Sequence, residues 1–155
     1  LDVVSDRGQR SFAVGIESPD AKILLEGFEF NKNAPLSSIL KQEYAIDTEV
    51  GSVSIPQFYP KEHLMIPEYA THVRFSFACA VIDAVTLTSK VKFAEQQMIS
   101  VDAEMADVEL TLDALPDLEG VKMFYILLEY FQDINGKLYP LKSGAYNALR
   151  LVRVV

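Results

Sequence analysis

Residues that could form a catalytic site are few in this chain. Nucleophilic catalysis needs a Ser or Cys beside a His that an acid orients, and His63 and His72 are the only imidazoles among 155 residues. The single cysteine, Cys79, shares the inward parity of an alternating run with Phe77 and Val81, so we expect a buried structural thiol. A Gly-x-Ser-x-Gly nucleophile elbow does not occur. The sequence predicts no catalytic residue and favours a protein that is not an enzyme.

Acidic side chains are the next candidates for chemistry. Zinc needs His and Cys at ligand spacing, which one Cys and two scattered His do not supply. Four carboxylates offer oxygen ligands suited to calcium, but their spacing is not that of an EF-hand loop, and half of them fall on an expected strand where they project into water. We therefore expect a solvated acidic face, with no metal and no cofactor. The four residues are Asp102, Glu104, Asp107 and Glu109.

The segment from Pro56 to Tyr69 is the first candidate for binding. Its prolines argue against a central strand and predict an ordered loop that presents aromatic groups, which suit contact with a partner. The alternative, which we favour, is a lid whose Phe58, Leu64 and Met65 cover an open end of the core. Both interpretations place this segment at the surface of a sheet structure.

The second candidate is a row of polar side chains on one face of the strand that follows. His72, Arg74 and Ser76 alternate with apolar neighbours and could hydrogen-bond an anion or a sugar hydroxyl, although alternation alone already predicts a polar outer face. The two segments together give five candidate ligand-binding residues, which are Tyr59, His63, Tyr69, His72 and Arg74.

Alternating strands must position these residues. Apolar and polar residues alternate over 72–81, 85–93 and 108–112, which predicts three strands with one dry and one wet face. The short Asp83-Ala84 link indicates that the first two strands form a hairpin. The acids of the third run are expected to face solvent.

The C-terminal part of the chain carries the clearest strand signals. The run 123–131 is apolar on both parities and predicts a central strand covered on both faces. Asn135-Gly136 tolerates positive φ and predicts a hairpin with 137–141, while Pro140 places that strand at an edge. Residues 149–155 predict a closing strand.

The N-terminal part is less regular. Over 23–30 the apolar parity changes at Gly27, which predicts strand with a β-bulge. The runs 44–47 and 52–56 predict a short hairpin. Residues 5–16 have room for one or two helical turns, so we expect at most a short N-terminal helix.

These elements define a fold class. About ten short strands separated by turns predict a mostly β, antiparallel β-sandwich in one domain, residues 1–155. The last strands resemble the end of immunoglobulin-like and fibronectin-like domains in pattern, without the Cys and Trp signature. The chain starts at Leu1, so we expect a piece of a longer parent, with 1–20 a linker or short helix.

Charge narrows the choice of partners. The net charge of −8 argues against nucleic acid, and no apolar run approaches the roughly 20 residues of a membrane span. Between Phe93 and Val121 there are eight acids and no Lys or Arg, whereas after Asp133 there are four bases and no acid. These separated acidic and basic stretches could pair between copies of the chain, so a protein partner or self-association is expected.

Six phrases carry a resemblance to a known family. The chain resembles an uncharacterised family of Bacteroidetes proteins, in which the similar segment forms the C-terminal part of longer proteins. The resemblance covers most of the chain from Ala21 onward, and it implies no activity and no site residue. The phrases are Gly27 to Asn31, Ala34 to Leu36, Val53 to Pro56, Ala70 to Arg74, Gln132 to Pro140 and Gly144 to Asn147.

Three functions remain as hypotheses. The leading one is a non-catalytic interaction or structural module. The second is a carbohydrate- or small-ligand-binding module that uses Tyr59, Tyr69 and the row of His72 and Arg74, although the chain has no tryptophan to stack on a sugar. The third is a hydrolase that uses dispersed carboxylates or His72, and no motif supports it.

Overall fold

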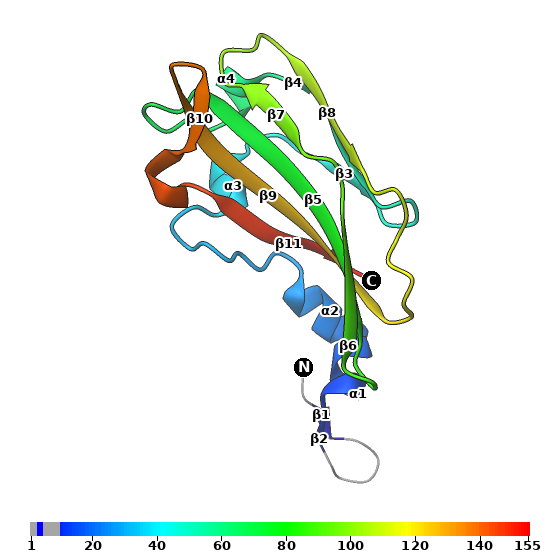
Figure 1. Cartoon of the computed structure of the whole chain (residues 1–155). Coiled ribbons are helices and arrows are strands. Elements are labelled where there is room, and N and C mark those ends of the chain that lie inside the picture. The colour runs from blue at the N-terminus through cyan, green and yellow to red at the C-terminus, as the bar shows by residue number, and fades with distance from the viewer. Residues whose placement is uncertain (1–2, 5–9) are drawn as a thin grey trace.

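The computed structural model describes residues 3–4 and 10–155, with side chains from Gly15 onward. The protein is mostly β, with antiparallel sheets and short helices, as the sequence predicted (Figure 1). The elements, in chain order, are β1 (Val3–Val4), β2 (Arg10–Ser11), α1 (Phe12–Glu17), α2 (Pro19–Leu25), α3 (Leu36–Ile39), β3 (Ala45–Asp47), β4 (Ser52–Phe58), α4 (Pro60–His63), β5 (His72–Asp83), β6 (Thr88–Phe93), β7 (Gln97–Ser100), β8 (Ala106–Thr111), β9 (Val121–Ile134), β10 (Lys137–Pro140), the 3₁₀ turn η1 (Leu141–Gly144) and β11 (Ala148–Val154).

A six-stranded antiparallel sheet is built on the two longest strands, β5 and β9, which pair along most of their length. Each of these strands has two short neighbours on its other side. The first half of β5 pairs with β7 and the second half with β6, while β11 pairs with the first half of β9 and β10 with the second half. Figure 1 shows the two long strands side by side, with β11 beside β9.

A second sheet contains three strands in the order β3-β4-β8. The predicted hairpin of 44–47 with 52–56 is confirmed, but the prediction of a loop from Pro56 onward is wrong, because β4 continues to Phe58. The ladder with β8 shifts register between Ile55 and Phe58. Pro56 therefore lies at a bulge, where the missing N–H of proline interrupts no ladder hydrogen bond. The freed Gln57 N–H donates instead to Asp107 Oδ1 at 2.9 Å.

The main hydrophobic core contains side chains from both sheets. Phe75 and Phe77 of β5 and Phe124 and Ile126 of β9 lie in one buried cluster with residues of β4 and β8, such as Ile55. Burying side chains of this size contributes about 1.5–3 kcal/mol each, so this cluster is the main source of stability.

The lid reading of residues 56–69 is supported. Phe58 and Leu64 are buried in the main cluster, and Met65 packs against it. The short helix α4, which begins at Pro60, forms part of this lid. The lid is also held to β9, because the Tyr130 hydroxyl donates a hydrogen bond to the Met65 carbonyl.

The predicted C-terminal hairpin, edge strand and closing strand are confirmed. Asn135 and Gly136 have φ of 54° and 85°, which suits a two-residue hairpin between β9 and β10. Pro140 lies on β10 at the end of the sheet path, and β11 is the expected closing strand.

The predicted strand over 23–30 is wrong, because residues 19–25 form α2. Ser18 caps this helix by accepting a hydrogen bond from the Ala21 N–H, and Pro19 occupies its first turn, where proline is favoured. Helices α1 and α2 cover one end of the large sheet, where Ile16 packs with Met123 and Leu151. The prediction of at most one short N-terminal helix is therefore too narrow, since α3 and α4 add further helical turns, and residues 5–9 of the predicted range lie outside the described residues.

The predicted strand over 85–93 is too long at its start. The chain turns at residues 84–87, and Val85 and Leu87 are exposed at this turn. Asp83 holds the turn by accepting hydrogen bonds from the Val85 and Thr86 N–H groups, and these bonds lower the pKa of its carboxyl. In the described part of the chain, every helix is too short or too polar to cross a membrane.

Candidate functional site

The structure places the five predicted ligand-binding residues in separate groups. Tyr59 and His63 form one pair at the start of the lid, where the Tyr59 N–H donates to His63 Nδ1 at 3.0 Å and the two rings meet edge to face. The His63 ring also lies 5.9 Å from the ring of Phe58. Tyr69 is exposed on a backbone with φ of 72°. Because its ring lies beside Phe58, which is fully buried, the imidazole of His63 helps to close the end of the core.

His72 and Arg74 lie two residues apart on the outer face of β5, as predicted. His72 Nδ1 hydrogen-bonds the Thr71 hydroxyl at 2.9 Å. The Arg74 guanidinium pairs with Glu129 of β9 at 2.8 Å and lies over the ring of Phe131. The polar groups of this row are thus engaged by neighbours within the chain.

The thiol of Cys79 is fully buried, as the sequence predicted. Burial raises the pKa of the thiol from an ordinary 9.0 to about 11. The thiolate is the nucleophilic form of cysteine, so Cys79 is inert near neutral pH. Among the residues that the structure describes, His, Cys, Asp and Glu form no group of three or more that could hold a metal ion.

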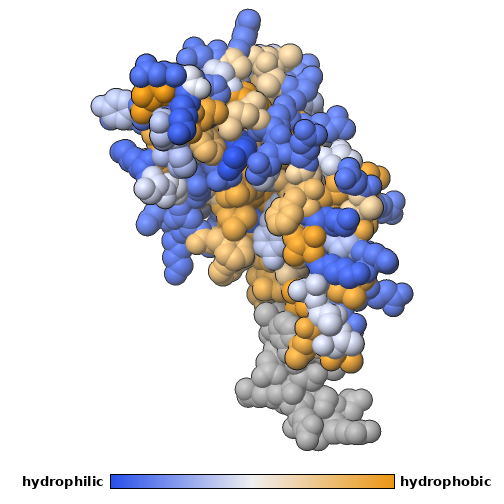
Figure 2. Space-filling view, in the orientation of Figure 1, coloured by the Kyte–Doolittle hydropathy of each residue, from blue (hydrophilic) through white to orange (hydrophobic). Residues whose placement is uncertain are grey.

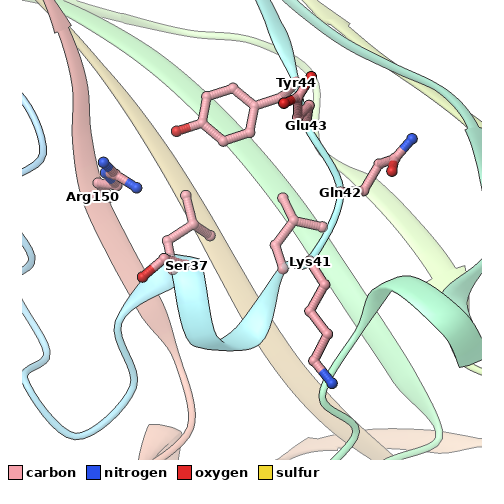
Figure 3. A pocket seen from close by; sticks show the side chains of 8 residues that line it. Ser37, Lys41, Gln42, Glu43, Tyr44 and Arg150 are labelled. Atoms are coloured by element: carbon pink, nitrogen blue, oxygen red, sulfur yellow. The ribbon is translucent and has the colours of Figure 1, made fainter.

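A polar cleft that the sequence did not reveal lies between α3, the segment leading into β3, and β11. Its volume is about 450 Å³. Figure 3 shows the Tyr44 hydroxyl pointing across the cleft towards the side of Arg150, with Ser37 below them on α3 and the Lys41 amine pointing away. The complete lining is Leu36, Ser37, Leu40, Lys41, Gln42, Glu43, Tyr44 and Arg150.

Arg150 is the charged residue that β11 contributes to this polar cleft. It projects from the inner face of β11, opposite Ile126, and its Nε lies 3.7 Å from Glu29 Oε1. Within the described residues the buried Nε has no hydrogen-bond acceptor. Glu29 Oε2 in turn accepts from the N–H of Leu36, which begins α3.

Gly27 and Tyr44 are two neighbours of Arg150. A side chain at Gly27 would place a Cβ 3.2 Å from Arg150 Nη2, and φ at this residue is +87°, so glycine allows the close approach. Burial raises the pKa of Tyr44, while the charge of Arg150 opposes the rise. Tyr44 therefore keeps its proton near neutral pH and offers a hydroxyl to the cleft.

An apolar groove lies on the outer face of the large sheet, the face turned away from β3, β4 and β8. Figure 2 shows hydrophobic residues gathered over β5, β9 and β11 in the middle of the view. The groove has a volume of about 450 Å³ and no charged residue in its lining. We call it the outer groove; its residues are Phe30, Ser76, Phe77, Ala78, Ala80, Val91, Phe93, Tyr125, Leu127 and Leu149.

The register of the sheet explains the shape of the outer groove. Its floor is a row of small side chains on β5, namely Ser76, Ala78 and Ala80. On one side rise Val91 and Phe93 of β6, which share the outer parity because Ala80 pairs with Val91 and Ala78 with Phe93. Small residues between larger neighbours leave a furrow.

The opposite wall comes from β9, β11 and the segment before α3. Tyr125 and Leu127 pair with the floor residues, and Leu149 of β11 lies next to Leu127. Phe30 extends this wall, with its ring 6.0 Å from Tyr125 and 4.9 Å from Phe28. The floor and much of this wall thus belong to β5 and β9, the two longest strands, which pair along most of their length.

Sequence reasoning missed both cavities. The prediction that 123–131 is covered on both faces is wrong over its middle, where Tyr125 and Leu127 are only half-buried. The sequence signal of the outer groove is the pair Ala78 and Ala80, which are small apolar residues on the parity that His72, Arg74 and Ser76 make polar. Arg150 is one of two arginines in an otherwise apolar closing strand, and its partner Glu29 is far away in the sequence, so the sequence does not single it out.

The sequence matches no family model and no curated protein, and the fold matches no solved structure. The resemblance to an uncharacterised Bacteroidetes family therefore stays a prediction. Inferences about function rest on the geometry of the two cavities and of the predicted residues.

Proposed function

We propose that this protein is a non-catalytic interaction module that docks another protein surface on its outer groove. The observation that carries the proposal is the groove itself, which is apolar, free of charged lining and built on the rigid centre of a sheet. Monomeric proteins rarely leave a large contiguous apolar patch exposed, and such patches mark interaction sites.

The scaffold we propose is a β-sandwich. Supporting this, the three-stranded sheet and the six-stranded sheet contribute to one buried cluster. The hairpin of β9 with β10, and β8 in the other sheet, agree with the immunoglobulin-like end expected for the chain. The pairing of β11 on the other side of β9 goes beyond that pattern.

A non-catalytic role is favoured by the state of the candidate groups. The Cys79 thiol is buried, His72 and His63 each hydrogen-bond a neighbour, and Arg74 pairs with Glu129. These contacts are those of side chains that stabilise the sheet and the lid, and the hydrolase hypothesis gains no support from them.

Site-specific photo-cross-linking tests the proposal. A benzoylphenylalanine replaces Phe93 in the outer groove, and in the matched control it replaces the exposed Thr111 of β8. In cells that produce the protein, we expect discrete cross-linked protein species from position 93 and not from position 111. Equal cross-linking from the two positions, or none from either, would contradict a docking function for the groove.

The polar cleft at Arg150 favours a second function, the binding of a small ligand. A buried guanidinium atom without an acceptor beside two hydroxyl groups suits an anionic group or sugar hydroxyls. Thermal-shift measurements with inorganic phosphate, small carboxylates and monosaccharides test it. A rise in Tm that is lost in Arg150→Gln and kept in Arg153→Gln, at an exposed site on the same strand, supports the cleft, and an unchanged Tm with every compound removes it.

A further inference from the structure

We propose that the partner docked on the outer groove is a second copy of this chain, in a twofold dimer in which Phe93 of each copy enters the groove of the other. This inference rests on the proposed docking function and names its partner. Three properties of the face support it, namely its area, its shape and its charge.

The exposed area fits a protein interface. Phe28, Phe30 and Phe93 have 54%, 53% and 75% of their surface exposed, which amounts to about 350 Å² if each ring can bury roughly 200 Å². Val91, which is 48% exposed, and the half-buried groove residues add to this area, so the face is comparable in size to the roughly 300–600 Å² of the largest patch on an ordinary monomer, and such patches are often functional. It would form the apolar centre of an interface of roughly 800 Å² per partner, with polar residues around it. A small apolar ligand would leave most of this area in water.

The shape is self-complementary. Phe93 projects beside a furrow whose floor is Ser76, Ala78 and Ala80, so a knob and a hole lie next to each other on one face. A twofold axis requires that residue i contacts residue j while j contacts i. An adjacent knob and hole satisfy this condition in a single closed arrangement.

The charge distribution permits two copies to approach face to face. Each copy carries −8, yet the groove lining is uncharged, and the ion pair of Arg74 with Glu129 beyond its floor is neutral overall. Of the acidic stretch, Asp107 and Glu109 lie on β8, in the other sheet. The remaining repulsion between copies is long-range and is screened by salt.

Analytical ultracentrifugation of the whole chain between roughly 1 and 100 µM tests the dimer. We expect a reversible monomer–dimer equilibrium whose Kd rises at least tenfold in Phe93→Ser and in Ala78→Glu, and stays unchanged in Thr111→Glu. Phe93 is largely exposed, so Phe93→Ser is expected to fold, and circular dichroism checks each variant. Raising NaCl from about 0.05 to 1 M should leave the dimer intact or strengthen it.

Two results of the ultracentrifugation series with the groove variants would overturn the dimer, and a third comes from the salt series. One is a monomer at every concentration, and the other is a dimer that both groove variants leave unchanged. Dissociation by salt would also contradict it, because that outcome indicates pairing of the acidic and basic stretches. If the chain is a monomer while position 93 still cross-links to a different protein, the dimer fails and the docking function stands.

Discussion

The two faces of β5 differ in what covers them, although both are apolar over the middle of the strand. On the inner face, Phe75, Phe77 and Cys79 are fully buried under the three-stranded sheet. On the outer face, Ala78 and Ala80 alternate with them but lie at the floor of an open groove. One strand thus contributes its inner face to the centre of the core and its outer face to the floor of the outer groove.

The comparison separates stability from binding. Inner-face residues gain from burial within one chain, so changing them should cost free energy of unfolding. Outer-face residues gain little from their own chain, so changing them should alter association more than stability. Each prediction below tests this division.

Phe77→Ala is expected to have the largest effect. Removing a fully buried phenylalanine loses its transfer free energy and leaves a cavity, which together cost about 3–5 kcal/mol. Urea denaturation followed by circular dichroism measures the loss. A cost below about 1 kcal/mol would show that the inner face is not the centre of the core.

A pair of enlarged side chains sharpens the contrast at neighbouring positions. Cys79→Leu adds volume to a packed interior and should cost about 1–3 kcal/mol. Ala78→Leu adds volume to the open groove and should change the stability of the monomer by less than about 0.5 kcal/mol. Denaturation at low protein concentration compares the two, and equal costs would contradict an open outer face.

High pH should weaken the inner face. Burial raises the pKa of Cys79 from 9.0 to about 11, so the unfolded chain loses this proton before the folded one. The thiol's contribution to stability is therefore complete below pH 9 and falls as pH rises through about 11. In urea titrations at about pH 7, 9 and 10.5, the wild type should lose more stability than Cys79→Ala. Parallel losses in both proteins would contradict the shift.

Phe93→Ala is expected to have the smallest effect on folding. Its side chain is exposed, so truncation should change the free energy of unfolding of the monomer by less than about 0.5 kcal/mol. Denaturation at low protein concentration measures this value. A loss above about 2 kcal/mol would place Phe93 in the core and break the division between the faces.

Much of the fold could be predicted because strand periodicity is local. The alternation through Phe75 and the Asn135-Gly136 turn gave β5 and the hairpin of β9 with β10, which the structure confirms. Helix α2 was missed because its apolar residues were matched to a strand period, although Ser18 and Pro19 form a good helix start.

The two cavities depend on contacts that sequence order does not contain. The polar cleft requires Arg150 of the last strand to meet Glu29 and Tyr44 from the N-terminal half. The outer groove requires Ala78 to lie between Phe93 and Tyr125, which only the strand register brings together. Periodicity gives the side of a strand that a residue faces, but it does not give what covers that side.

The placement of lysines on β6 has a consequence for how copies can add to one another. β6 ends the sheet path among the described strands, and Lys90 and Lys92 flank Val91 on this edge. A second β6 laid antiparallel alongside would bring ammonium groups together, and lysine on an edge is a known defence against strand addition. Growth of a continuous fibril by edge pairing is therefore disfavoured, which agrees with the closed pair proposed for two copies of the chain.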